Sequence, residues 1–157
     1  MNAIHIQAAS VNDAEQILSV IVEAFEQYRH RLDPPSGVFR ETPESIRQKI
    51  ENGGFTACDG EKIIGAVLYE PHSDYMYLGR LAVLPVYRRR HIAVDLIATV
   101  EQAAHEQNLS RVRLGVRIGL EGNQRLFQNL GYQIIEQHSH EGYSEITYLM
   151  MEKRLTT

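Results

Sequence analysis

The sequence has little of what secreted, membrane-spanning or nucleic-acid-binding proteins need. Its one cysteine, Cys58, excludes an intrachain disulfide, which is typical of a reducing compartment. No segment approaches the roughly 20 apolar residues of a membrane-spanning helix, and the first residues do not resemble a signal peptide. A formal net charge of −4 argues against nucleic acid as a partner. We therefore expect a cytoplasmic protein that binds neither membrane nor nucleic acid.

The remaining composition and periodicity predict a single domain over residues 1–157. Its length and 43% hydrophobic content suit one core, and no linker or repeat interrupts it. Apolar spacing predicts the order β-α-α-β-β-β-α-β-α-β-β, hence an α/β (α+β) fold. Thr42 and Pro43 predict the start of the second helix. The pair Asp59-Gly60 predicts a hairpin between two apolar runs.

Residues 85–93, "PVYRRRHIA", place three arginines between the strand expected at 75–85 and a helix expected at 91–108. A helix start carries unpaired N–H groups and positive partial charge, so it already favours an anion. Arg88, Arg89 and Arg90 would add bidentate donors for phosphate, which suits a ligand with several phosphates. A solvated basic corner is the alternative, because short charge runs usually face solvent.

The stretch "LAVLPVYRRRHIAVDLI" resembles the acetyl-coenzyme A motif of the GNAT family of N-acetyltransferases. In that family a strand ending in V-x-P-x-Y leads into Q/R-x-x-G-x-G/A at a helix start. Arg88 takes the first motif position, His91 the first glycine position and Ala93 the second. "DGEKIIGAVLYE", "NQRLFQNLGY" and "YLMMEKRL" match further family segments in the same order. The resemblance implies a mixed, mostly antiparallel sheet of about seven strands and about four helices, with a splayed central parallel pair.

The resemblance also implies a cosubstrate and a site. Acetyl-coenzyme A would donate its acetyl group to a small-molecule or peptide amine, without a metal, and a homodimer would fit the family. Backbone groups of the strand before the motif would pair with the pantetheine arm and stabilise the oxyanion, and the motif would hold the pyrophosphate. The implied coenzyme-binding residues are Leu81, Ala82, Val83, Arg88, Arg89, Arg90, His91, Ile92, Ala93, Asn123 and Phe127.

Two departures from the family pattern concern proton transfer. Phe127 stands where many members have a tyrosine that protonates the leaving thiolate, so it would line the coenzyme arm or pack in the core. The central strand "YMYLGRL" offers no carboxylate as a base. Tyr77, as a water-positioning group, and Glu70 are the catalytic candidates, although Glu70 also fits a solvated strand end. A coenzyme A-binding module with weak or no turnover is therefore the alternative function.

The acceptor site is expected from two variable segments, the loop 29–41 and the connection 138–145. Glu41, Glu141 and Glu145 could attract an amine. The two histidines of "HSH" at 138–140 lack the further ligands of a metal site, and we interpret them as a loop. We expect Cys58 to be a buried core residue, because free cysteine is commonly buried.

Overall fold

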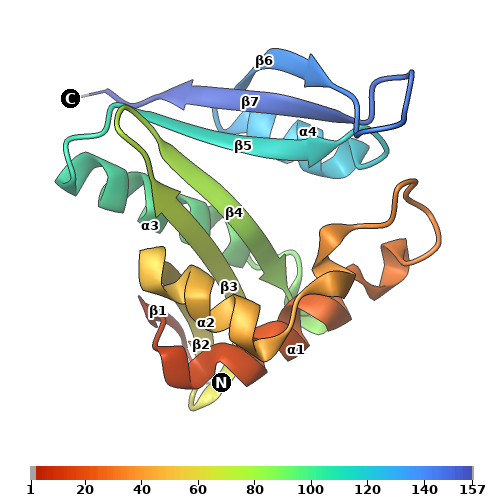
Figure 1. Cartoon of the computed structure of the whole chain (residues 1–157). Helices are drawn as coiled ribbons and strands as arrows, with labels where there is room; N and C mark the ends of the chain where they lie inside the picture. Colours follow the sequence, from red (N-terminus) through yellow and green to blue (C-terminus); the bar gives the residue numbers. More distant parts are fainter. Residues whose placement is uncertain (1–2, 157) are drawn as a thin grey trace.

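The computed structural model describes residues 3–156. Within that range it has seven strands and four α-helices in the predicted order (Figure 1). The strands are β1 Ile4–Ala8, β2 Gly54–Asp59, β3 Lys62–Pro71, β4 Met76–Val83, β5 Arg111–Arg117, β6 Gln133–His138 and β7 Tyr148–Arg154. The helices are α1 Ala14–Phe25, α2 Pro43–Asn52, α3 Ile92–Glu106 and α4 Glu121–Asn129. This confirms the expected mixed α/β fold.

The strands form one sheet in the order β1-β2-β3-β4-β5-β7-β6, and β4 and β5 are its parallel neighbours. In the described part of the chain, these two strands pair only at Met76 with Val112 and at Tyr77 with Arg113. Beyond those pairs they diverge into an open wedge (Figure 1). The splayed central pair is thus confirmed.

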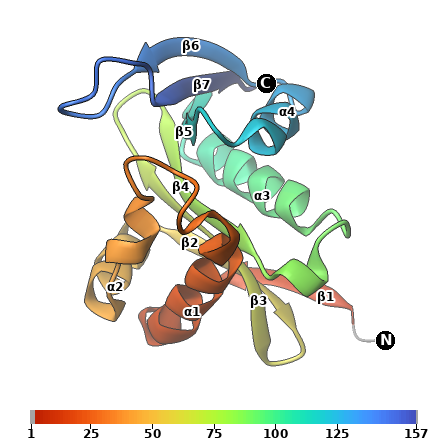
Figure 2. The same ribbon diagram turned by 90° about the vertical axis from the view of Figure 1, so that its right-hand side faces the viewer.

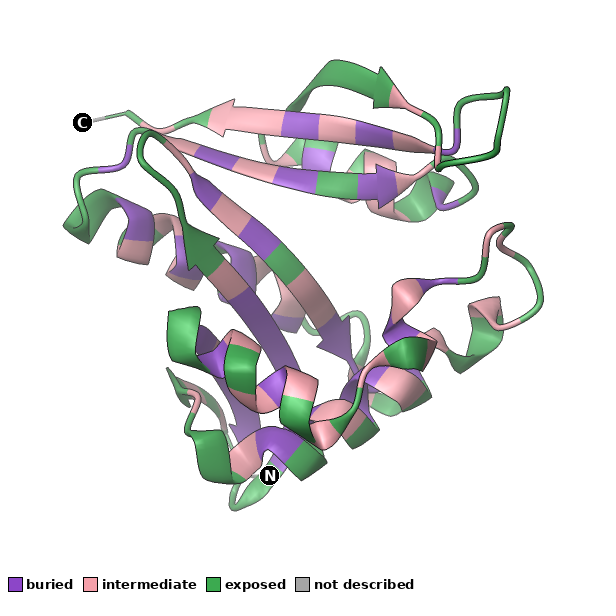
Figure 3. Ribbon diagram, in the orientation of Figure 1, coloured by how far each residue is buried: buried purple, intermediate pink, exposed green. Residues whose placement is uncertain are grey.

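Helices cover both faces of the central strands. In Figure 1, α1 and α2 lie in front of β3 and β4, and α3 crosses behind them; Figure 2 shows α4 beside α3. Residues 63–68 of β3 are all buried, as expected for a strand covered on both faces. Burial alternates along β5 instead (Figure 3). Val112, Leu114 and Val116 of β5 join the core, so Arg113, Gly115 and Arg117 lie on its opposite face.

Local signals explain where several elements begin and end. At the start of α2, the Ser45 N–H donates to Thr42 Oγ1 at 3.1 Å, and the Thr42 N–H donates to Ser45 Oγ at 2.8 Å. Pro43 follows as the first helical residue, so the predicted cap is confirmed. Gly60 has φ 62°, a left-handed conformation that suits the predicted hairpin turn between β2 and β3.

β4 contains a bulge at the point where it leaves β5. Val67 pairs with Leu81 and Tyr69 pairs with Leu78, so Gly79 and Arg80 together face one residue of β3. A bulge re-aims side chains and ends regular pairing. No local pattern in the sequence predicts this bulge, because a bulge depends on the register of two paired strands.

Arg80, from this bulge, anchors the segment before α2. Its Nε donates to Glu41 Oε2 at 2.7 Å, Ser45 Oγ donates to Glu41 Oε1 at 2.7 Å, and Lys49 also donates to this carboxylate. The Glu41 side chain is only 4% exposed. Burial alone would raise the pKa of Glu41, but the bonds from Lys49, Ser45 and Arg80 outweigh it and lower this pKa to about 2. Glu41 is therefore occupied within the protein rather than available to an amine.

Replacing Glu41 by glutamine tests this anchor. At neutral pH we expect Glu41→Gln to lose about 3 kcal/mol of unfolding free energy, because a neutral amide cannot pair with Lys49 and Arg80. The carboxyl pKa is 4.5 when unfolded and about 2 when folded, so its contribution is complete above pH 4.5 and is lost as the pH falls toward 2. Urea denaturation from about pH 7 to about pH 3 should show the difference narrowing below pH 4.5. A constant difference would contradict the ion-pair explanation.

Candidate functional site

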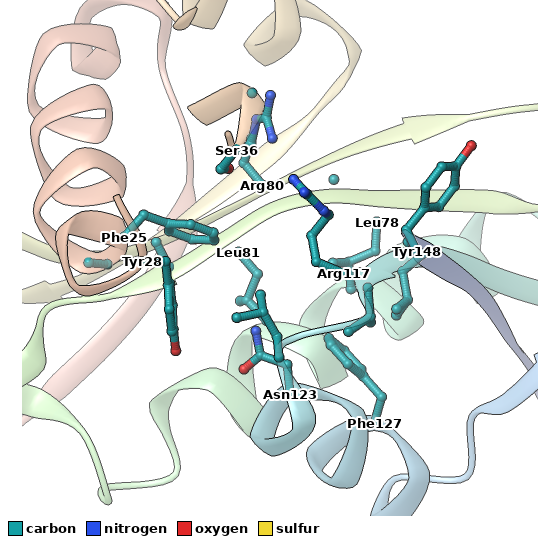
Figure 4. A pocket seen from close by; sticks show the side chains of 18 of the residues that line it. Phe25, Tyr28, Ser36, Leu78, Arg80, Leu81, Arg117, Asn123, Phe127 and Tyr148 are labelled. Atoms are coloured by element: carbon teal, nitrogen blue, oxygen red, sulfur yellow. The ribbon is translucent and has the colours of Figure 1, made fainter. Parts of the chain in front are cut away.

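A cavity of about 880 Å³ lies in the wedge between β4 and β5. It is lined by residues 77–83 of β4 and 114–117 of β5, together with α1, α4, the segment before α2 and the β6–β7 connection. Figure 4 shows Asn123 and Phe127 of α4 on one side, and Arg80, Arg117 and Tyr148 on the other. The cavity therefore passes through the sheet, from the side of α4 to the side of the loop before α2.

Most of the residues predicted to bind the coenzyme arm line this cavity. Leu81, Ala82 and Val83 do so from the part of β4 that has left β5. Asn123 points into it from α4 (Figure 4). Phe127 lines it as well, yet is only 5% exposed and packs edge-on against Tyr132 with ring centroids 5.5 Å apart. Phe127 is thus both a core aromatic and part of the cavity wall.

The turn before α3 presents a run of free main-chain donors. Among residues 3–156, no acceptor pairs with the N–H groups of 89–94, and His91 provides no side-chain cap. Arg89 has φ 66° and His91 has φ 61°, both left-handed. Left-handed residues within such a turn help successive N–H groups form an anion-binding concavity. Ile92 is buried in the core, so it offers only its main chain here.

The side chains of the same turn differ in whether they line the cavity. Arg88 and Ala93 line it, and Arg88 is also solvent-exposed, whereas Arg89, Arg90 and His91 are exposed and do not line it. The Arg88 guanidinium also donates to the Ala24 carbonyl at 3.0 Å, in the last turn of α1. A cation at that position is stabilised by the negative end of the α1 helix dipole. Arg88 therefore joins α1 to the turn, a contact that sequence spacing could not indicate.

Tyr77 is the catalytic candidate that the structure places in the gap. Its Oη lies 3.5 Å from the point where a Cβ on Gly115 would stand, so it reaches from β4 to β5 where the strands part. Burial raises the pKa of Tyr77, which keeps its phenol neutral. Glu70 lies in a separate cavity of about 270 Å³ that Tyr77 also lines. Its side chain is 52% exposed and 3.4 Å from His72 Nε2, which fits the solvated strand end.

Several polar residues at the other end of the cavity were not singled out from the sequence, although two of them, Arg40 and His140, lie in the segments expected to form the acceptor site. The residues are Arg40, Arg80, Arg117, His140 and Tyr148. One Nη of Arg117 donates to the Pro34 carbonyl, and its Nε is buried without a partner among residues 3–156. Burial lowers the pKa of Arg117. The alternation of "RVRLGVRI" could have placed Arg117 on one face with Gly115. It could not show which loops would enclose that face.

The two variable loops meet over this end. The Tyr143 hydroxyl of the β6–β7 connection donates to Asp33 of the loop before α2. The His140 N–H donates to Thr147 Oγ1 at 2.9 Å, and its ring Nδ1 contacts the same hydroxyl. Burial lowers the pKa of His140, as do the charges of Arg117 and Arg40. His140 is thus a neutral imidazole beside two arginines.

Three further features concern Cys58, side chains that could hold a metal ion, and the length and polarity of the helices. Cys58 is 2% exposed within the core, as predicted. Within residues 3–156, no group of three histidine, cysteine or acidic side chains is arranged to hold a metal ion. Over the same range, every helix is too short or too polar to cross a lipid bilayer.

Solved structures of similar shape are N-acetyltransferases. PaiA N-acetyltransferase from Thermoplasma acidophilum, solved with coenzyme A, has a TM-score of 0.83 at 17% identity and covers 97% of this chain and 99% of its own. Ard1 from Thermoplasma volcanium has a TM-score of 0.81 at 16% identity and covers 99% of both chains. The ribosomal-protein-S18-alanine N-acetyltransferase of Escherichia coli has 0.78 at 15%, covering 99% and 96%. The chain thus has the fold of these N-acetyltransferases.

A family model decides the identity more directly than shape. The model described as the acetyltransferase (GNAT) family matches residues 16–132, about three quarters of the sequence. The chain belongs to the GNAT family of acetyltransferases. It is an N-acetyltransferase that uses acetyl-coenzyme A, as the sequence motif predicted. A comparison with curated protein sequences gives no significant match.

The strain at His91 gives a testable prediction. A left-handed conformation costs a non-glycine residue about 1–2 kcal/mol, and glycine at this position would remove that cost. Part of the stabilisation is offset, because glycine has greater conformational entropy in the unfolded state. We therefore expect His91→Gly to stabilise the protein by about 0.5–1 kcal/mol and to retain acetyl-coenzyme A binding. Thermal denaturation and calorimetric titration measure the two effects. Glycine at Val94, inside α3, is the matched control and should destabilise. Loss of coenzyme affinity in His91→Gly would instead assign the imidazole a direct contact.

Proposed function

We propose that residues 1–157 act as one domain that transfers an acetyl group from acetyl-coenzyme A to a primary amine, by direct attack within a ternary complex. The observation that carries this proposal is the continuous cavity through the wedge. It extends from near the unpaired N–H groups of 89–94 to Tyr77 and Gly115, where β4 and β5 part. Two reactants can therefore enter from opposite faces of the sheet and meet in the gap.

The coenzyme occupies the side of the wedge nearest α3 and α4. Its pyrophosphate accepts hydrogen bonds from the N–H groups of 89–94, where the dipole of α3 favours negative charge. The peptide-like pantetheine arm pairs with the open edge of β4 at residues 81–83, since their main chain no longer faces β5. The Asn123 amide and the Phe127 ring contact this arm from α4.

The reaction needs only the two bound reactants and a proton path. The lone pair of the amine nitrogen attacks the thioester carbonyl carbon, and the carbonyl oxygen becomes an oxyanion held by a main-chain N–H of the bulged part of β4. The oxyanion then reforms the carbonyl as the C–S bond breaks. The thiolate leaves with that electron pair, and the nitrogen loses one proton. Acetylated amine and coenzyme A thiol are the products.

Tyr77 is the residue to which we assign proton management. Its neutral phenol lies in the gap, where it can orient a water that takes the proton from the amine and returns it to the thiolate. Glu70 is a weaker candidate, because it lies in the neighbouring cavity and is half-exposed beside His72. Phe127 has no exchangeable proton, so the role passes to the Tyr77 hydroxyl, which reaches toward Gly115 where the strands part.

Charge reversal at Arg88 tests the coenzyme site. We expect Arg88→Glu to weaken acetyl-coenzyme A binding at least about tenfold, because a carboxylate at the cavity wall repels the pyrophosphate. Lys62→Glu, an equal charge reversal on the exposed β2–β3 hairpin, is the matched control and should bind normally. Calorimetry gives both affinities, and circular dichroism shows whether loss of the Ala24 contact disturbs the fold. Absence of any acetyl-coenzyme A binding to the unaltered protein would refute the proposed function.

A second prediction concerns turnover. We expect Tyr77→Phe to lower kcat about 10²-fold, within the usual range for a lost proton-transfer group, while acetyl-coenzyme A affinity stays unchanged. Tyr75→Phe is the matched control, because Tyr75 stacks on His72 outside the cavity. Release of free thiol in the presence of an amine measures kcat. Equal rates for Tyr77→Phe and the unaltered protein would remove Tyr77 from the mechanism. Coenzyme binding without thiol release for any amine would support the non-catalytic alternative.

A further inference from the structure

Three arginines converge on the end of the cavity away from α4. Arg40 comes from the segment before α2, Arg80 from the bulge of β4, and Arg117 from the end of β5. Figure 4 shows Arg80 and Arg117 on the side of the cavity away from Asn123 and Phe127. One Nη of Arg80 and one of Arg40 lie 3.1 and 3.4 Å from the point where a Cβ on Gly37 would stand. Like charges held this near to one another repel, and an anion between them would relieve the repulsion.

The donors of these arginines are only partly used inside the protein. Arg80 gives its Nε to Glu41, and Arg117 gives one Nη to the Pro34 carbonyl. The Nε of Arg117 is buried without a partner in the described residues, which is costly for a charged donor. Arg40 has no acidic group within 4 Å among residues 3–156. Donors for an anion therefore remain at this end of the cavity.

The acidic groups nearby offset the charge of this cluster only in part. Glu41 is shared among Arg80, Lys49 and Ser45. Asp33 accepts a hydrogen bond from Tyr143, but burial lowers the pKa of Arg117 and outweighs the charge of Asp33, which raises this pKa. Glu141 lines the cavity but is exposed and has no ion pair within the described residues. The lowered pKa of His140 also reflects the positive charge of Arg117 and Arg40. The local charge thus favours an anion, although the whole chain is acidic.

We infer that the acceptor of this acetyltransferase is an amine that carries a carboxylate a few atoms from its nitrogen, and that Arg117 and Arg40 bind this carboxylate. The inference rests on the proposed function, because it assigns the same cavity its second reactant. Successive residues on one strand face are about 7 Å apart, so Arg117 is one such step along β5 from Gly115 and the gap. That step, with the length of the arginine side chain, suits a small molecule whose amine reaches the thioester.

Matched pairs of acceptors test the inference. Each pair is a free amino acid and its carboxamide, which have the same amine and side chain but differ in charge. We expect kcat/KM to be at least about tenfold higher for the acid, because charge-assisted hydrogen bonds to guanidinium are lost in the amide. Calorimetric binding of the same pairs to the coenzyme A complex is measured in parallel, so the comparison does not depend on turnover. If the acid has neither a higher kcat/KM nor a higher affinity than its carboxamide, the inference is overturned.

Arginine variants identify the groups responsible. We expect Arg117→Gln to lower kcat/KM for the acid about tenfold and to leave the amide within about twofold, so the discrimination disappears. Arg40→Gln should reduce the discrimination between acid and amide several-fold. The Arg40 side chain is exposed, so misfolding would not explain such a loss. Arg125→Gln removes an equal charge from the exposed face of α4 and should leave kcat/KM unchanged for both the acid and the amide. Unchanged discrimination in both cavity variants overturns the assignment.

The design separates this inference from the proposed function. Acetyl-coenzyme A affinity is measured for every variant and should be unchanged in Arg117→Gln. If the unaltered protein does not bind acetyl-coenzyme A, the proposed function fails. If it binds and acids have no advantage, only the inference fails. Short peptide amides with aspartate or asparagine as their second residue form a further pair. A preference confined to the aspartate peptide assigns the carboxylate to a peptide side chain, whereas a preference among free amino acids assigns it to a small molecule.

Discussion

The interrupted pairing between β4 and β5 is the constraint on which the site depends. Two parallel pairs, at Met76 and Tyr77, hold the strands together, and the ladder then stops. Main-chain donors and acceptors that a continuous sheet would consume are left facing a cavity of about 880 Å³. Unpaired backbone groups are costly in a dry interior but useful beside a peptide-like ligand. The same opening therefore supplies both the space for two reactants and the groups that align one of them.

The wedge is kept open by contacts on both of its sides. The bulge at Gly79 and Arg80 shifts the register of β4 against β3 just beyond the last β5 pair, and Arg80 binds Glu41 at the start of α2. On the opposite side, the buried Phe127 and Tyr132 pack against each other beneath β5 and fix α4. Closing the gap would disturb the partly buried ion pair of Arg80 with Glu41 on one side and the core aromatics on the other. The cavity is thus built into the fold rather than left by loose packing.

Much of this architecture could be predicted from the sequence, because its signals are local. The element order, the Thr42 cap, the Asp59-Gly60 turn and the basic turn before α3 all follow from short-range patterns. What could not be predicted arises from contacts distant in sequence. The β4 bulge depends on register with β3, the Arg88 contact joins residues 64 positions apart, and the enclosure of Arg117 requires two loops to meet. Period-two alternation places Arg117 on a face but says nothing of its neighbours.

The acidic chain concentrates positive potential at both ends of one cavity. At one end, free N–H groups and the dipole of α3 face the expected diphosphate. At the other, Arg40 and Arg117 line the end to which we assign the acceptor. Between them lies Tyr77, whose pKa is raised by burial so that its phenol stays neutral, and the charges of Arg80 and Glu70 act on this pKa in opposite directions. Such a division lets charge orient both reactants from their far ends, so that the amine and the thioester meet in the gap between β4 and β5.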